Sequence, residues 1–183
     1  MLDLRIGGGL LHDTVLVADS LLDGGTIGHI RSADSVKTHE TRTGCLFQDV
    51  PLAVLVAKHT SSGNVFLAAA LQDNQRAIVV GEPTASQTYV RSILEVPGGR
   101  TKIILPTAIM ERGDGTPLLG PRRQQPTRLG DLSQSGERSR RASFIMPDHI
   151  VEVSKGQREA EDPTLAKAVD VLRNATAETT TDG

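Results

Sequence analysis

The chain has 183 residues, with 20 Lys and Arg against 22 Asp and Glu and a net charge of −2. This length fits one domain, or one domain with a tail, and the charge balance argues against a generally basic nucleic-acid binder. Three Phe, one Tyr, no Trp and a single cysteine exclude a base-stacking platform, an internal disulfide framework and a cysteine-rich zinc site.

The first part of the chain predicts a strand, a glycine turn and a helix. A strand over 1–5 leads into Gly7-Gly8-Gly9. Apolar residues then recur at helical spacing over 10–22 until Asp23-Gly24-Gly25 ends the pattern.

A second unit of the same kind follows. Residues 31–49 are polar and mixed and predict a loop with short strands, whereas the apolar run 51–57 predicts a strand buried on both faces. The small residues of 60–64 form a turn, and the Ala- and Leu-rich run 65–73 predicts a helix. Another short strand is expected over 76–81.

The third part combines a hairpin with a long polar segment. Residues 88–96 and 100–109 are rich in β-formers and flank Pro97-Gly98-Gly99, which predicts a hairpin. Gly, Pro, Arg, Gln and Ser dominate 111–143, which predicts an exposed surface insertion. Structure is expected to resume over 144–153.

The last predicted element is a helix that Asp162-Pro163 opens. Its apolar face is expected to consist of Leu165, Ala168, Val169 and Leu172. Residues 176–183 predict a polar tail. The order of elements indicates a mixed α/β domain over 1–175, and sites in such folds form beyond the carboxyl ends of strands.

Ser62 is the strongest candidate nucleophile. It lies between a buried strand and a helix, where the free amides of the helix start, that of Gly63 among them, could hold a developing oxyanion. The alternative is that Ser61 or Ser62 is a helix N-cap, a position that serine favours. His12 and His59 flank the two small-residue turns, so either could act as a base, or both could be partly exposed turn residues.

Gly7-Gly8-Gly9 allows two interpretations. Glycines let backbone amides approach a ligand, which would suit a phosphate or another small molecule at a helix start. The spacing of a dinucleotide fingerprint and the Lys-Ser/Thr of a P-loop are missing, however, and a tight turn needs no ligand. None of the five histidines shows metal-ligand spacing, so we expect no metal and no cofactor. No stretch approaches the roughly 18 apolar residues of a membrane span.

Six motifs stand in a characteristic order along the chain: Leu2-Asp3-Leu4-Arg5 before Gly7-Gly8-Gly9-Leu10-Leu11, Thr60-Ser61-Ser62, Ala70-Leu71-Gln72-Asp73-Asn74, Val79-Val80-Gly81-Glu82, Pro147-Asp148-His149-Ile150-Val151, and Leu165-Ala166-Lys167-Ala168. Together they resemble the carboxyl-terminal processing proteases (tail-specific proteases) of peptidase family S41. The resemblance covers most of 2–110 and 144–173. It implies a ClpP/crotonase-like core of ββα units, of which this chain would be the carboxyl-terminal part without a PDZ domain.

The resemblance also implies a serine peptidase that cleaves the C-terminal tails of proteins. By alignment on the Leu71-Gln72-Asp73-Asn74 motif, the family nucleophile falls on Ser62 and the oxyanion donors on the amides of Gly63, Gly8 and Gly9. The family's general-base lysine falls on Gln87, and the glutamine that orients it falls on Arg91.

The replacement of the family's lysine by Gln87 and of its glutamine by Arg91 bears on activity, because a glutamine amide cannot accept a proton near neutral pH and arginine stays protonated. Loss of a general base costs on the order of 10²–10⁴ in rate. We therefore expect a weak or inactive peptidase, or alternatively a non-catalytic relative that binds peptides or forms oligomers. An absent upstream part of the core would leave a sheet edge open to a complementary segment. The family acts mostly in the periplasm or otherwise outside the cytoplasm, but 1–30 carries no signal-peptide pattern, so the location stays open.

Overall fold

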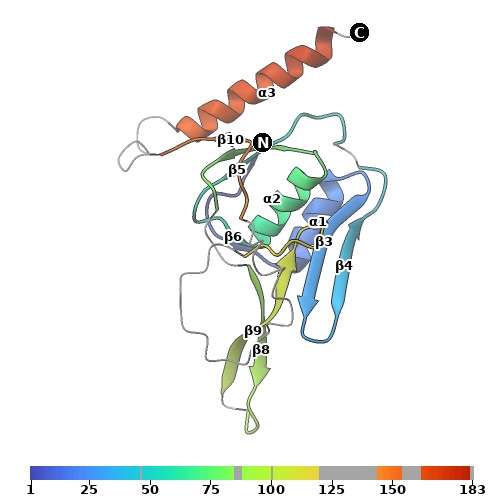
Figure 1. Ribbon diagram of the computed structural model, residues 1–183, viewed down its shortest axis with the longest axis vertical. Helices are drawn as coiled ribbons and strands as arrows, with labels where there is room; N and C mark the ends of the chain where they lie inside the picture. Colours follow the sequence, from blue (N-terminus) through green and yellow to red (C-terminus); the bar gives the residue numbers. More distant parts are fainter. Residues whose placement is uncertain (46, 85–87, 100, 120–143, 154–161, 182–183) are drawn as a thin grey trace.

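The computed structural model describes residues 1–45, 47–84, 88–99, 101–119, 144–153 and 162–181 (Figure 1). In these ranges the chain forms a parallel sheet, a short two-stranded pairing, an antiparallel sheet and three helices. In chain order the elements are β1 (Leu2–Asp3), β2 (Gly8–Gly9), α1 (Leu11–Leu21), β3 (Gly25–Ser32), β4 (Val36–Thr41), β5 (Ala53–Val56), β6 (Ser61–Ser62), α2 (Gly63–Asp73), β7 (Ile78–Gly81), β8 (Tyr89–Glu95), β9 (Lys102–Glu111), β10 (His149–Ile150) and α3 (Pro163–Thr181).

The parallel sheet has the strand order β1-β5-β7-β10 and carries helices on both faces. Every side chain of β5 is buried, as the apolar run 51–57 predicted. Alternate residues of β5 pack in opposite directions, because successive side chains of a strand point to opposite faces. Val54 and Val56 belong to the cluster around α2, whereas Ala53 and Leu55 contact Ala168 of α3.

α2 is the central helix of the molecule. Eight of its eleven residues are buried, including the whole run from Val65 to Leu71. Its neighbours are the parallel sheet, α1 and β3 (Figure 1). A helix with so little polar surface is stable only inside a core, and the position of α2 there fixes the turn that precedes it.

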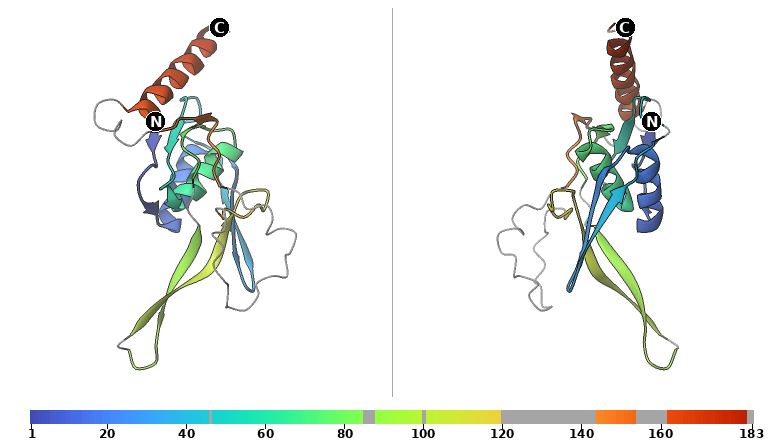
Figure 2. Two further views of the ribbon diagram at one scale, coloured as in Figure 1. Left: turned by 60° about the vertical axis from the view of Figure 1, so that its left-hand side comes forward. Right: turned by 90° about the vertical axis from the view of Figure 1, so that its right-hand side faces the viewer.

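The antiparallel sheet has the strand order β4-β3-β9-β8 and corrects one prediction. Residues 31–49 were expected to form a loop with short strands. β4 is such a strand, but its partner β3 begins earlier than expected, at Gly25, and the two form a hairpin with a register shift between Thr26 and Gly28. The first part of β3 gave a weak strand signal because it contains Gly28, whose φ of 147° and close approach to the Phe66 ring and the Glu111 carbonyl leave no room for a side chain. The predicted hairpin of 88–109 is confirmed as β8 and β9, which project from the body (Figure 2).

The prediction of an exposed surface insertion over 111–143 is wrong for its first residues. Glu111 still belongs to β9 and is buried, and Leu118 returns to the core with 1% of its surface exposed. The chain turns between them, where Arg112 N–H donates to Thr116 O at 2.8 Å. Residues 120–143 lie outside the described part of the chain.

The last helix is longer than predicted. α3 runs through to Thr181, so 176–181 are helical rather than a polar tail, and no glycine or proline interrupts the sequence before that point. The buried stripe contains Thr164, Ala168 and Val171, whereas Leu165 is exposed instead of facing the core. Among the described helices, none is long and apolar enough to cross a membrane.

Candidate active site

The glycine turn and the serine turn lie side by side at the carboxyl ends of β1 and β5. β2 pairs with β6 in parallel, with Gly8 opposite Ser61 and Gly9 opposite Ser62. The carbonyl of Gly7 accepts hydrogen bonds from the Ser61 amide at 3.3 Å and the Ser61 hydroxyl at 3.2 Å. The fold thus brings together Ser62, Gly8 and Gly9, which the sequence places more than fifty residues apart.

Ser62 has an unusual backbone conformation. Its φ of 53° and ψ of −129° place it in a region that side-chain-bearing residues rarely adopt, and among the described non-glycine residues only Gln75 shares a positive φ. Ser62 occupies the N-cap position of α2, but its hydroxyl makes no capping hydrogen bond. The N-cap interpretation therefore holds for the position and not for the side chain.

Close packing explains the glycines around Ser62. A methyl group on Gly8 would lie 2.9 Å from the Ser62 Cβ, and one on Gly63 would meet the Thr14 hydroxyl and lie 2.7 Å from the Gly9 carbonyl oxygen. These close approaches pack the two turns tightly against each other beside Ser62. Thr14 is 5% exposed and donates to Leu10 O at 2.9 Å, so it buttresses both turns from α1. From the sequence, Thr14 is indicated only as one residue of the predicted helix over 10–22.

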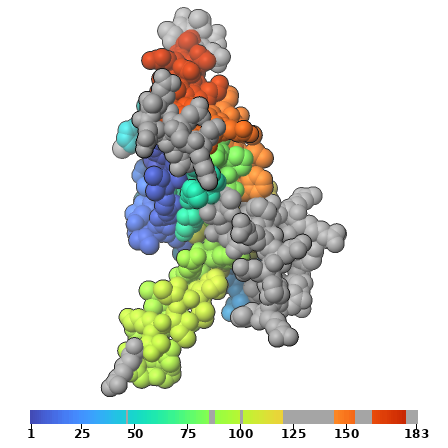
Figure 3. Space-filling model, turned by 90° about the vertical axis from the view of Figure 1, so that its left-hand side faces the viewer, coloured from blue at the N-terminus to red at the C-terminus, as the bar shows by residue number. Residues whose placement is uncertain are grey.

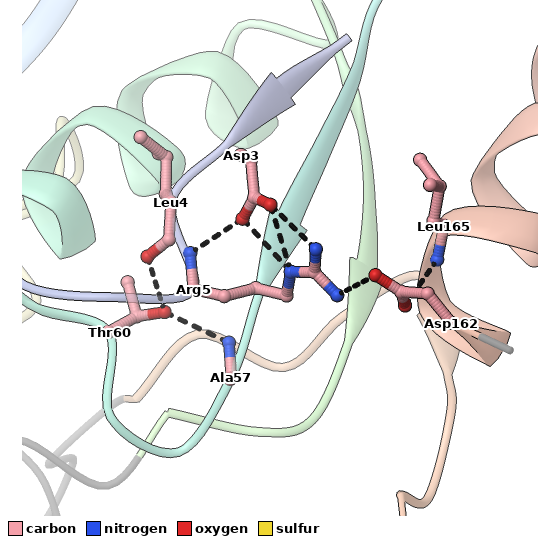
Figure 4. A network of polar contacts seen from close by, with 7 residues as sticks. All are labelled: Asp3, Leu4, Arg5, Ala57, Thr60, Asp162 and Leu165. Carbon is pink, nitrogen blue, oxygen red and sulfur yellow. Dashed lines mark hydrogen bonds and ion pairs between the residues drawn. The ribbon is translucent and has the colours of Figure 1, made fainter. Parts of the chain in front are cut away.

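A buried threonine joins the two units below their turns. The Thr60 hydroxyl donates to the Leu4 carbonyl at 2.8 Å and accepts from the Ala57 amide at 2.9 Å (Figure 4). The Leu4 amide donates to Leu55 O at 2.9 Å. These contacts hold the strand that leads to the glycine turn against the strand that leads to Ser62. The sequence shows only a threonine two residues before the candidate nucleophile, whereas its burial and its bonds to Leu4 and Ala57 depend on the fold.

An arginine at the end of the first strand links it to the last helix. The Arg5 guanidinium donates to both carboxylate oxygens of Asp3 and to Asp162 at 2.6 Å (Figure 4). Asp162 also caps α3 by accepting from the Leu165 amide at 3.0 Å. The hydrogen bonds from Arg5 hold the pKa of Asp3 below its usual value. For Asp162 burial opposes ionisation, but the Leu165 amide and Arg5 outweigh it and lower the pKa.

The Gln72-Asp73-Asn74 motif clamps the end of α2 to three other segments. The Gln72 amide donates to Met146 O at 2.9 Å and to Asp148 at 3.1 Å. Asp73 forms an ion pair with Arg112, and burial raises the pKa of this carboxyl. The Asn74 side chain donates to Thr26 O at 2.9 Å and to Ala70 O at 2.8 Å. The motif therefore positions the helix that carries Ser62.

Three of the remaining predicted site residues are exposed. His12, in the first turn of α1, and His59, in the turn between β5 and β6, are both exposed. Arg91 is exposed on β8. Gln87 lies outside the described residues. In the described ranges no three His, Cys, Asp or Glu side chains gather closely enough to hold a metal ion.

Comparison with known proteins decides the family. The sequence profile named "Peptidase family S41" matches residues 1–122, two thirds of the chain. The chain belongs to peptidase family S41. Its similarity to a carboxyl-terminal-processing protease of Picosynechococcus sp. is 39% identity over 100 residues, which is 54% of this chain and 24% of that protein.

Further S41 relatives show the same pattern. The chloroplastic carboxyl-terminal-processing peptidase 2 of Arabidopsis thaliana is 38% identical over 54% of this chain and 20% of its own length. A carboxy-terminal-processing protease of Bartonella bacilliformis is 31% identical over 66% of this chain and 28% of its own length. The chain thus spans about a quarter of the curated relatives it matches.

Solved structures agree on the S41 fold. The photosystem II D1 C-terminal processing protease superposes with a TM-score of 0.64 at 22% identity, over 93% of this chain and 38% of that one. A lipoprotein from Streptococcus agalactiae superposes with a TM-score of 0.62 at 18% identity, over 95% of this chain and 54% of that one. The mixed α/β fold of S41 protease domains is therefore present in this chain.

Proposed function

We propose that Ser62 is the nucleophile of a serine peptidase that cleaves the C-terminal tails of proteins, and that turnover is low because Gln87 stands where the family has its general-base lysine. The observation that carries the proposal is the backbone of Ser62. Ser62 holds a strained backbone conformation at a strand-to-helix junction, and its hydroxyl makes no capping hydrogen bond at the start of the buried helix α2. Similar strained turns hold the nucleophile in other serine hydrolases.

The surrounding backbone suits the chemistry of acyl transfer. When the Ser62 oxygen attacks a peptide carbonyl, negative charge develops on the carbonyl oxygen, and preorganised N–H groups stabilise it. The amide of Gly63 at the start of α2 and those of Gly8 and Gly9 in the paired turn are the proposed donors. The close packing of Gly8 on Ser62 and of Gly63 on Gly9 would hold these donors in place without reorganisation.

The missing base sets the expected rate. Ser62 must lose its proton as it attacks, and the Gln87 amide cannot take it. A lysine whose pKa is lowered by burial could accept this proton. The two histidines proposed as substitute bases, His12 and His59, are both exposed, and either would have to lie within hydrogen-bond reach of the Ser62 hydroxyl to accept its proton.

Restoring the base tests the proposal. A disordered protein with an apolar C-terminus is incubated with the chain, and cleavage is followed by mass spectrometry. We expect Gln87→Lys to raise the cleavage rate by about 10²–10⁴, and Ser62→Ala in that background to abolish it. Gln87→Arg is the matched control, since it restores a positive charge that does not titrate.

The presence of Gln87 at the position of the family's lysine also suggests a second candidate function. If folded Gln87→Lys cleaves nothing but the parent chain binds the peptide, the S41 scaffold serves as a non-catalytic peptide-binding module. That result would overturn the assignment of Ser62 as a nucleophile. Fluorescence anisotropy with a labelled apolar peptide measures the binding.

A further inference from the structure

The β8–β9 hairpin carries apolar side chains that nothing in the described part of the chain covers. Figure 3 shows it as a yellow-green projection beyond the body of the molecule. Ile93 on β8 and Ile104 on β9 are 64% and 62% exposed and lie directly opposite each other on one face. The opposite face exposes Leu94, Ile103 and Leu105. An isolated two-stranded hairpin is marginal in water, and exposed apolar surface of this kind marks an interface.

The outer edge of β8 is open to pairing. In the sheet order β4-β3-β9-β8 this strand is an edge, with β9 as its neighbour among the described strands. The Val96 amide donates to Thr101 O at 3.0 Å, so in the alternation of an antiparallel ladder Leu94 also directs its backbone groups to β9. Arg91, Ile93 and Glu95 then direct theirs outward.

The position of a proline agrees with this assignment. Pro106 stands opposite Arg91 in the register of β8 and β9. Because proline has no N–H, it is tolerated only where the ladder needs no donor. If the backbone groups of Arg91 point outward, they need no hydrogen bond from residue 106 on β9, so a proline fits there. The open edge of β8 thus presents the amides and carbonyls of alternate residues, as a strand ready to pair does.

We propose that the open edge of β8 pairs with β8 of a second copy of this chain, antiparallel and centred on Ile93. In this register Ile93 faces Ile93 of the second copy, and the outward backbone groups of both strands meet. Arg91 faces Glu95 of the second copy, and by the two-fold symmetry the same ion pair forms twice.

The register also aligns side chains across the four strands of the joint sheet. On one face Ile104 and Ile93 of both copies form a continuous apolar row, because each Ile93 lies between Ile104 and the two-fold axis. Beside this row Glu95 lies between Lys102 of its own strand pair, 3.2 Å away, and Arg91 of the second copy. Charge complementarity and apolar contact therefore select the same partner.

The first test is oligomeric state, measured by analytical ultracentrifugation of the full 183-residue chain. We expect a dimer that dissociates in the range up to about 0.1 mM. Ile93→Lys should abolish it, because two lysines would meet on the symmetry axis. Since Ile93 is mostly exposed, circular dichroism should show the fold unchanged. A chain that stays monomeric throughout this range overturns the proposal, as does a dimer that survives Ile93→Lys.

Charge reversal then tests the register. Glu95→Arg should weaken the dimer at least tenfold by placing two arginines opposite each other, and Arg91→Glu combined with Glu95→Arg should restore it. The double variant restores only the pairs between copies, since the Glu95–Lys102 pair stays broken. Glu40→Arg on the exposed edge strand β4 is the matched control and should change nothing. Failure of the double variant to recover would exclude this register.

Cross-linking gives an independent measure of the same register. In a Cys45→Ser background, Ile93→Cys should oxidise to a disulfide-linked dimer, because opposed residues lie about 5.5 Å apart between Cα atoms. Leu94→Cys should not, since its symmetric equivalent is displaced along the strand. Cross-linking of Leu94→Cys without Ile93→Cys would place the axis elsewhere and overturn the assignment.

Discussion

The two strand–turn–helix units of this protein, residues 1–22 and 51–73, have similar sequence patterns but are stabilised differently: the first mainly by polar contacts and the second by burial. In the first unit α1 buries only Thr14 and Ala18, and the strand before it is anchored by Arg5 and by the Leu4–Thr60 contact. In the second unit α2 is buried along most of its length. The first turn takes its positive φ at a glycine, Gly7, whereas the second takes it at Ser62. A strained serine persists only where surrounding packing over-determines it.

The largest expected effect is a change in the core around α2. Leu71 is completely buried on α2, whereas Leu16 on α1 is 50% exposed. We expect Leu71→Ala to lower the free energy of unfolding by about 2–5 kcal/mol through a cavity, and Leu16→Ala by less than about 0.5 kcal/mol. Urea denaturation followed by circular dichroism measures both. Equal losses would show that the two helices contribute alike to stability.

The contact between the two turns is the next point to break. Gly63→Ala places a methyl group against the Gly9 carbonyl and the Thr14 hydroxyl, so we expect a loss of about 1–3 kcal/mol in the free energy of unfolding. Gly113→Ala is the control, since its methyl group would meet Thr26 at an ordinary 3.6 Å. Adding Thr14→Ala to Gly63→Ala should recover only part of the lost stability, because the new methyl group would still meet the Gly9 carbonyl.

The strain at Ser62 predicts a stabilising substitution. Ser62→Gly should raise the free energy of unfolding by roughly 1 kcal/mol, since glycine adopts a positive φ freely. Ser62→Ala keeps the strained backbone and should gain nothing. Ser61→Gly should destabilise, because the bond from its hydroxyl to the Gly7 carbonyl is lost. Thermal unfolding of the three variants ranks them, and a neutral Ser62→Gly would argue against stored strain.

The smallest expected effect is the loss of folding stability at acid pH, and it arises from Asp3 and Asp162 beside the first unit. The pKa values of Asp3 and Asp162 are lowered in the folded state, so their contribution is present above their unfolded pKa, about 3.9, and is lost as the pH falls through the folded values. The raised pKa of Asp73 acts in the opposite sense, favouring the folded state at low pH.

Removing Arg5 should expose this difference between the units. Arg5→Met is expected to lower the free energy of unfolding by up to about 1 kcal/mol at neutral pH, because the pairs are partly solvated. The loss of stability between about pH 4 and pH 2 should shrink in the same variant, as urea denaturation across pH would measure. Arg173→Met on the exposed side of α3 should leave the pH dependence unchanged.

Several features could be predicted from the sequence because they depend on local patterns. The buried strand β5, α1, the hairpin and the helix that begins at Pro163 follow from periodicity and turn residues, and all are present. The family resemblance carried on the Gln72-Asp73-Asn74 motif is confirmed as well. The first part of β3 was not predicted, because Gly28 is required by contact with Phe66 and Glu111, which are distant in sequence.

For the site, the sequence by itself determined the residue types at each turn and the absence of a lysine at Gln87. It could not show that Ser62 would be strained rather than capping, since that conformation is imposed by a buried helix. Only the tertiary structure decided that Gly9 lies opposite Ser62 and that Thr60 joins the two strands. These contacts connect residues far apart in the chain, and burial and backbone pairing, which no local pattern encodes, bring them together.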